Sequence, residues 1–103
     1  MLGEFEYLVI SAASRLGESA YGAAIRAEIE RATKRSCSIG ALYTTMDRLE
    51  SKGLIETWMG EATAERGGRA KRMVRVTGKG ARDAAAFWQA ITKATRGLAW
   101  EAK

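Results

Sequence analysis

Residues 38–53 read Ser38-Ile-Gly-Ala-Leu-Tyr-Thr-Thr-Met-Asp-Arg-Leu-Glu-Ser-Lys-Gly53 and form the most informative segment of the chain. Its apolar residues recur at steps of three and four, the spacing of one helix face: Ile39, Leu42, Met46 and Leu49. Ser38 is a good N-cap, and Gly53 is typical of a helix end. The opposite face carries only small or hydroxylated residues and one long cation: Gly40, Ala41, Thr44 and Arg48. Such a face fits the major groove of DNA, although the pattern also fits an ordinary amphipathic helix with a solvated outer face.

Two further helices are predicted before this segment. Apolar residues at the helical period indicate a helix over residues 2–16, which Gly17 ends. A second helix is expected over about residues 21–33, with Ser19 as its cap. Its inward-facing residues are expected to be Ala24, Ile25, Ile29 and Ala32. Because a short turn over residues 34–37 then leads into the helix at Ser38, the order is that of a helix-turn-helix.

Residues that favour β-structure follow Gly53. We predict two antiparallel strands over residues 54–59 and 72–77, joined by a glycine-rich projecting loop. Two strands are not stable alone in water, so they must pack on the helices. Cations gather at the loop and the return strand, where they can reach DNA phosphates or the minor groove: Arg66, Arg69, Lys71 and Arg72. The predicted fold is mainly α with a small two-stranded β wing, that is, a winged helix-turn-helix.

A last helix is expected to begin after its cap Thr77 and to run to the C-terminus. Its apolar residues repeat at alternating steps of four and three, as in a coiled-coil seam. This seam meets either a partner subunit or the chain's own helices, and we favour the partner. The expected dimer contacts are Phe5, Leu8, Ala84, Trp88, Ile91 and Leu98. The predicted organisation is therefore a DNA-binding domain at residues 1–77 and a dimerisation helix at residues 78–103, which would place two recognition helices roughly 34 Å apart.

Charge and composition narrow the class of function. Seventeen Lys and Arg against twelve Asp and Glu give a net charge of +5. Residues 66–82 hold cations and no acid, which suggests a polyanionic partner. The chain has no histidine, no zinc-ligand spacing and no phosphate-cradling loop before a helix, so we expect neither an enzyme nor a bound metal or cofactor. The single cysteine, the absence of a signal peptide and the lack of a long apolar run predict a cytoplasmic protein without a membrane partner.

Several segments together resemble one protein family. They are Tyr21-Gly22-Ala23-Ala24-Ile25, residues 38–55, the glycine-arginine segment at residues 65–72, and Val76-Thr77-Gly78-Lys79-Gly80. In these the chain resembles the PadR family of transcriptional regulators, over about residues 2–82. The resemblance implies a DNA-binding repressor that dimerises through its first and last helices, in a short form without a larger C-terminal domain. Some members bind aromatic or drug-like ligands between the subunits. The chain departs from the family at Met73-Val74, where a pair of aromatic residues is usual.

The predicted partner is double-stranded DNA, bound by a homodimer. The residues expected to contact it are Ser38, Tyr43, Thr44, Thr45 and Arg48 of the recognition helix and Arg66, Arg69, Lys71 and Arg72 of the wing. Trp88 is the candidate for binding a small aromatic effector, although plain packing on the seam also explains it. Cys37 precedes a helix, whose N-terminus can lower the pKa of a thiol, so a redox switch is an alternative to a buried structural role. A winged helix that contacts protein or RNA, without specific DNA readout, is the competing function.

Overall fold

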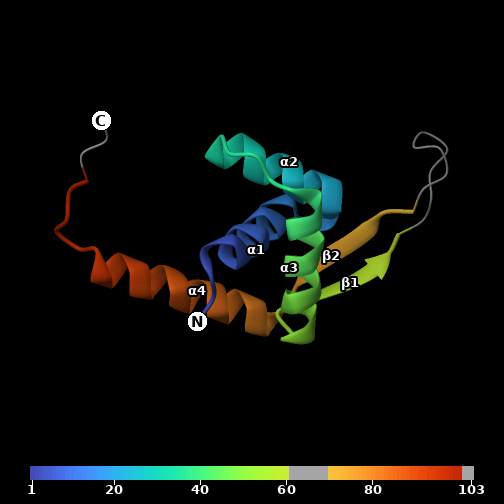
Figure 1. Cartoon of the computed structure of the whole chain (residues 1–103). Coiled ribbons are helices and arrows are strands. Elements are labelled where there is room, and N and C mark those ends of the chain that lie inside the picture. Colours follow the sequence, from blue (N-terminus) through green and yellow to red (C-terminus); the bar gives the residue numbers. More distant parts are fainter. Residues whose placement is uncertain (61–69, 101–103) are drawn as a thin grey trace.

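The computed structural model describes residues 1–60 and 70–100. Along the chain these form α1 (Glu4–Leu16), the short 3₁₀ turn η1 (Gly17–Ser19), α2 (Gly22–Thr33), α3 (Ile39–Ser51), β1 (Ile55–Met59), β2 (Arg72–Val76) and α4 (Gly78–Ala94). Figure 1 shows α1, α2 and α3 gathered into one body, with the two strands on one side of it. The helix α4 runs along the base of this body and extends beyond it. The predicted mainly α fold with a two-stranded wing is confirmed.

Most of the predicted helix boundaries are confirmed, and two are wrong. The Ser38 hydroxyl accepts a hydrogen bond from the Ala41 N–H at 3.2 Å, and the Thr77 hydroxyl accepts one from the Gly80 N–H at 3.0 Å. Ser19 does not cap α2, because it lies in η1 and Tyr21 precedes the helix instead. The last helix ends at Ala94, so residues 98–100 are not helical and the seam does not continue through them. Gly97, with φ of 81°, lies in the left-handed conformation typical of a helix end.

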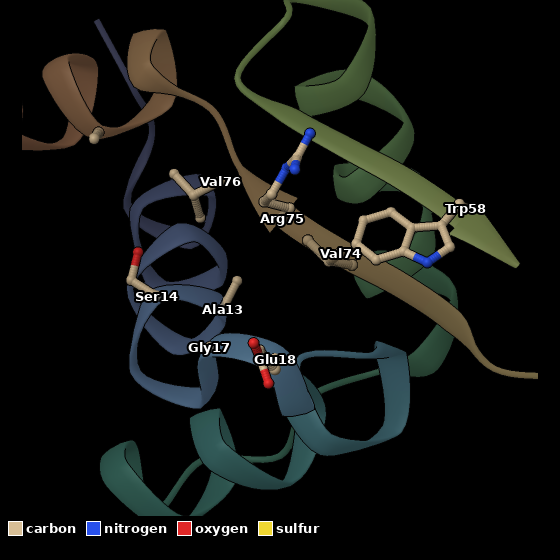
Figure 2. Close-up of a pocket in the computed structure, with 9 residues that line it drawn as sticks. Ala13, Ser14, Gly17, Glu18, Trp58, Val74, Arg75 and Val76 are labelled. Carbon is tan, nitrogen blue, oxygen red and sulfur yellow. The ribbon is translucent and has the colours of Figure 1, made fainter. Parts of the chain in front are cut away.

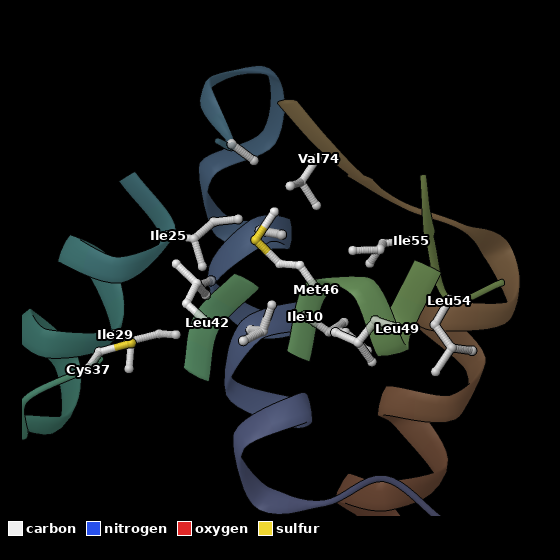
Figure 3. Packing of buried hydrophobic residues seen from close by; sticks show 14 of the residues in the cluster. Ile10, Ile25, Ile29, Cys37, Leu42, Met46, Leu49, Leu54, Ile55 and Val74 are labelled. Carbon is white, nitrogen blue, oxygen red and sulfur yellow. The ribbon is translucent and has the colours of Figure 1, made fainter. Parts of the chain in front are cut away.

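The core is organised around the apolar face of α3. Figure 3 shows Leu42, Met46 and Leu49 surrounded by side chains of every other main element of the body. The fully enclosed residues include Val9, Ile10, Ile25, Leu42, Met46, Leu49, Leu54 and Ile55. Two residues predicted to face inward do not: Ile39 is 45% exposed and Ala32 is exposed. Ile39 is the first residue of α3, and the buried residues of this helix begin one turn later at Leu42.

The strand β2 lies between two neighbours. On one side it pairs antiparallel with β1, with Ile55 opposite Val76 and Met59 opposite Arg72. On the other side the Val74 N–H donates to the Ala20 carbonyl at 3.0 Å, and Tyr21 forms a bridge with Met73. The wing is therefore joined by backbone hydrogen bonds to the segment that leads into α2.

The helix α4 begins in close contact with Leu54, in the segment that links α3 to β1. Gly80 is buried, and a Cβ atom there would lie 2.1 Å from the Leu54 carbonyl oxygen. The Thr77 N–H donates to the same oxygen at 3.1 Å. Further along, the Phe87 ring of α4 stacks on Tyr7 of α1 with 4.7 Å between centroids. Beyond Phe87 most side chains of α4 are exposed. Within residues 1–60 and 70–100, no helix is both long enough and apolar enough to span a membrane.

Candidate nucleic-acid interface

The helix α3 presents three faces with different surroundings. Leu42, Thr45, Met46 and Leu49 form its buried face. Tyr43, Asp47 and Glu50 form a second face, which turns toward β2 through contacts with Arg72. Gly40, Ala41, Thr44 and Arg48 form the third, and all four are exposed. We call this third group the open face. Thr45 is only 5% exposed, so the expectation that it contacts DNA is wrong.

Arg48 is the one long side chain of the open face. It forms no ion pair or side-chain hydrogen bond with any residue in the described ranges. Its sequence neighbours Asp47 and Glu50 instead form ion pairs with Arg72. A guanidinium that is exposed and forms no ion pair keeps all five N–H donors available for a ligand. Ser38 and Thr44, also predicted to contact DNA, are exposed on the same helix.

Arg72 connects the wing to α3. Its Nη2 atom lies 2.9 Å from Asp47 Oδ1 and 3.4 Å from Glu50 Oε1, and its side chain is 21% exposed. Glu50 also accepts hydrogen bonds from the Thr57 N–H and hydroxyl on β1. The two carboxylates therefore hold Arg72 against α3, so it is less available for phosphate contact than the sequence predicts.

A small cavity of about 330 Å³ lies where α2 begins, between α3 and β2. Lys71 Nζ lies 4.5 Å from the centroid of the Tyr21 ring, a cation–π distance. The Tyr43 hydroxyl lies so close to Gly22 that a Cβ on residue 22 would be 2.4 Å from it. The sequence predicts Tyr43 and Lys71 at this interface but not Tyr21 or Gly22. The signal for the last two is the Tyr21-Gly22 pair at the start of α2, which belongs to the segments that carry the family resemblance.

Some of the remaining wing cations lie outside the described residues, and others lie within them. Arg66 and Arg69, with most of the predicted loop, lie outside the described residues. Lys71 is half-buried beside Tyr21, and Arg75 pairs with Glu56 on β1 with 2.5 Å between Nη2 and Oε2. Within the described ranges, Lys71 is therefore the wing cation that has no acidic partner.

The end of α3 is tied to the start of α1 by a buried carboxylate. Glu6 is 6% exposed; its Oε1 accepts from the Gly3 N–H at 2.9 Å and its Oε2 from Lys52 Nζ at 3.0 Å. The Gly3 N–H bond and the Lys52 ammonium lower the pKa of Glu6, against an opposing effect of burial. Glu6 is thus ionised near neutral pH and holds the C-terminal end of α3 in place.

Cys37 does not have the surroundings of a reactive thiol. It is 4% exposed, and burial followed by the nearby Glu30 carboxylate raises the pKa of its thiol. The pKa shift is opposite to that expected from a helix N-terminus. The redox-switch hypothesis is therefore not supported, and Cys37 is a buried residue of the hydrophobic core.

The residues predicted to form a dimer contact fall into two groups. Phe5, Leu8 and Ala84 are half-buried and pack against the core of the single subunit. Trp88 is 59%, Ile91 41% and Leu98 57% exposed, and Trp100 beyond them is also exposed. The second half of α4 and the residues after it thus carry large apolar side chains that the subunit does not cover.

Comparison with known proteins gives a consistent result. A family model described as the transcriptional regulator PadR-like family matches residues 9–86. No curated protein matches the sequence significantly. Among solved structures, F93 from STIV, a winged-helix DNA-binding protein, is 16% identical and has a TM-score of 0.74, with 96% of this chain and 99% of that chain covered. A PadR-like transcriptional regulator from Bacillus cereus is 20% identical with a TM-score of 0.67, and 91% and 93% are covered. RosR of H. salinarum is 24% identical with a TM-score of 0.68, and 95% and 81% are covered.

Proposed function

Because the chain belongs to the PadR-like family of transcriptional regulators, we propose that it binds a specific DNA sequence through α3 and thereby represses transcription. Membership of the family shows that the chain is a transcriptional regulator. Its sequence-specific DNA binding, its repression of transcription and its assembly into a homodimer are proposals. The function is binding, and we propose no catalytic reaction for the chain.

The open face of α3 is the observation that carries this proposal. Its small side chains allow the helix to lie deep in a major groove, and Arg48 at the C-terminal end of this face forms no ion pair or side-chain hydrogen bond in the described ranges. An arginine in this position can donate two hydrogen bonds to O6 and N7 of guanine. Lys71 and the Tyr43 hydroxyl flank the helix, where they can contact phosphates and fix its register.

We expect Arg48→Ala to abolish sequence preference. Loss of a bidentate contact to guanine costs about 1–3 kcal/mol, which is roughly a tenfold to hundredfold loss in affinity for the preferred duplex. The measurement is fluorescence anisotropy with the promoter upstream of the protein's own gene and with a scrambled duplex of equal length. Arg96→Ala removes the same charge far from α3 and serves as the control.

The comparison between the two duplexes tests whether α3 reads a specific DNA sequence. Stronger binding to the promoter that is lost in Arg48→Ala but kept in Arg96→Ala would support specific readout by α3. Equal binding of wild type to both duplexes would place the operator elsewhere and leave only a general DNA binder. Absence of binding to either at low salt would contradict the proposal and favour a winged helix that contacts protein or RNA.

We further propose that the chain acts as a homodimer, with residues 1–77 as the DNA-binding domain and α4 and the residues after it as the dimerisation element. The exposed apolar side chains of Trp88 and Ile91 support this assembly, since surfaces of this kind usually meet another protein. A small aromatic effector at Trp88 belongs to the same proposal, because Trp88 is 59% exposed and only a second subunit could enclose a ligand there.

We expect Trp88→Glu to produce monomers. A carboxylate on the apolar half of α4 would have to be buried without a partner in the dimer, which is strongly unfavourable. Sedimentation velocity of the wild type and the variant measures the change. Met59→Glu introduces the same charge at an exposed apolar residue of the wing and should leave the dimer intact. A wild-type monomer at micromolar concentration would contradict the dimer.

A further inference from the structure

The ion pair between Arg72 of β2 and Asp47 of α3 lies beside the open face of α3. Asp47 is 68% exposed, and at about 100° per residue it is offset by only about 20° from Gly40 of the open face. We propose that Asp47 is a positioning residue that keeps Arg72 from binding phosphates and so limits the affinity of the chain for DNA. This proposal rests on the DNA binding proposed above, and it adds a residue that opposes that binding.

Asp47 and Glu50 contact the same guanidinium but differ in their other contacts. Glu50 Oε2 accepts hydrogen bonds from the Thr57 N–H and hydroxyl, and Glu50 Oε1 lies 3.4 Å from Arg72 Nη2. Asp47 Oδ1 lies closer to Arg72 Nη2, at 2.9 Å, and within residues 1–60 and 70–100 Asp47 pairs with Arg72 alone. Glu50 therefore also attaches β1 to α3, whereas the charge of Asp47 is committed to Arg72.

Arg72 lies close to the groups that are expected to contact phosphates. It lines the cavity of about 330 Å³ to which Lys71 and Tyr43 also belong. Its Cζ atom lies 5.9 Å from the centroid of the Tyr43 ring, a cation–π distance, so this ring keeps the guanidinium beside α3 even without Asp47. A released Arg72 would therefore add its N–H donors to the phosphate contacts proposed for Lys71 and the Tyr43 hydroxyl.

A phosphate and the Asp47 carboxylate compete for this guanidinium, because both are anions that accept its parallel N–H bonds. In the wild type, DNA must displace Asp47 before Arg72 can bind a phosphate, and the displaced carboxylate then lies near the phosphates as a like charge. An exposed ion pair is worth up to a factor of about five in an equilibrium constant, and the repulsion adds to this factor. The expected consequence is a lower affinity for every DNA sequence than the interface would have without this carboxylate.

Asp47→Asn removes the charge and keeps the shape of the side chain. We expect the affinities for the promoter duplex and for the scrambled duplex to rise by a similar factor, about fivefold for each subunit, because a phosphate contact carries no sequence information. The slope of log affinity against log salt should become steeper by about one for each subunit. Fluorescence anisotropy of the purified full chain at a series of salt concentrations measures both quantities. The wing stays attached in this variant, because Glu50 still binds Thr57 and the Val74 N–H still bonds the Ala20 carbonyl.

Glu56→Gln is the matched control, because it also removes one carboxylate and releases one arginine of β2. That arginine is Arg75, which is three residues from Arg72 and therefore on the opposite face of the strand. Figure 2 shows Arg75 on the part of β2 that lines a groove between this strand and α1. The same change in net charge is thus made on the other face of the sheet, and the slope should keep its wild-type value.

Removal of Arg72 tests whether Asp47 acts through this residue. In the Arg72→Gln background, Asp47→Asn should leave the slope unchanged and raise affinity much less than in the wild type, because no guanidinium remains to be released. An equal gain in both backgrounds would mean that Asp47 only repels phosphates, and it would overturn the proposal. A loss of affinity in Asp47→Asn would overturn it too, since loss for the promoter alone would indicate base reading by Asp47 and loss for both duplexes would indicate attachment of the wing.

A heparin column separates this proposal from the proposal of DNA binding. Heparin presents closely spaced anionic groups without bases, so it reports the release of Arg72 even if the wild type binds neither duplex. We expect Asp47→Asn to elute at higher salt than Glu56→Gln, although the two variants have the same net charge. Elution of both variants at the same salt would overturn the proposal. Later elution of Asp47→Asn from a chain that binds no duplex would refute the proposed function, whereas the restraint of Arg72 by Asp47 would stand.

Discussion

Replacing Gly80 by alanine is expected to destabilise the protein severely. The new Cβ atom would lie 2.1 Å from the Leu54 carbonyl oxygen and 3.0 Å from the Val76 Cγ1 atom, and the first of these belongs to the backbone. Relief would require α4 to move away from the start of β1, which would break the hydrogen bond from the Thr77 N–H to the same oxygen. We expect a loss of about 3 kcal/mol or more in the free energy of unfolding, measured by urea denaturation.

Gly78→Ala provides a matched control in the same turn of α4. A Cβ on Gly78 would meet only the end of the Arg82 side chain, at 3.3 Å, and this side chain can rotate away. The expected change is therefore small, or a gain of about 0.4–1 kcal/mol from the reduced freedom of the unfolded chain. If both variants unfolded at the same urea concentration as wild type, the close approach at Gly80 would not determine stability.

DNA affinity is expected to fall about a thousandfold or more between 50 and 200 mM salt. This follows if the proposed dimer neutralises six or more phosphates, since each contact releases condensed counterions. Arg48 and Lys71 are the described cations at the interface without an acidic partner, whereas Arg72 is held by Asp47 and Glu50. The measurement is anisotropy with one duplex at a series of salt concentrations, from which the slope of log affinity against log salt is obtained.

A variant of Lys71 tests which cations contribute to that slope. Lys71→Gln should reduce the slope by about one for each subunit, because one phosphate contact is lost. Lys93→Gln on the exposed part of α4 should leave it unchanged. An affinity that hardly varies over this salt range in the wild type would contradict an interface made of phosphate contacts.

The parts of the fold that were predictable depend on residues close together in the sequence. The caps Ser38 and Thr77 and the helix end near Gly53 were identified correctly, because a cap acts on N–H groups three residues away. The burial of Thr45 was also predictable from the sequence. At about 100° per residue it lies at the edge of the arc formed by Leu42, Met46 and Leu49, about 40° beyond Leu49, so the same periodicity places it beside the core.

Contacts between distant segments were not predictable in the same way. The ion pair of Arg72 with Asp47 joins residues 25 apart, and the pair of Lys52 with Glu6 joins residues 46 apart. Which cations face outward depends on such pairs, and no local pattern reveals them.

The three faces of α3 have a practical consequence for engineering. Folding depends on the buried face, and attachment of the wing depends on Tyr43, Asp47 and Glu50 through Arg72. The open face takes part in neither task, since Gly40, Ala41, Thr44 and Arg48 are exposed. A combinatorial library randomised at these four positions alone would therefore vary the proposed DNA-reading surface on a constant scaffold, so that selection for new operators would not also select for folding.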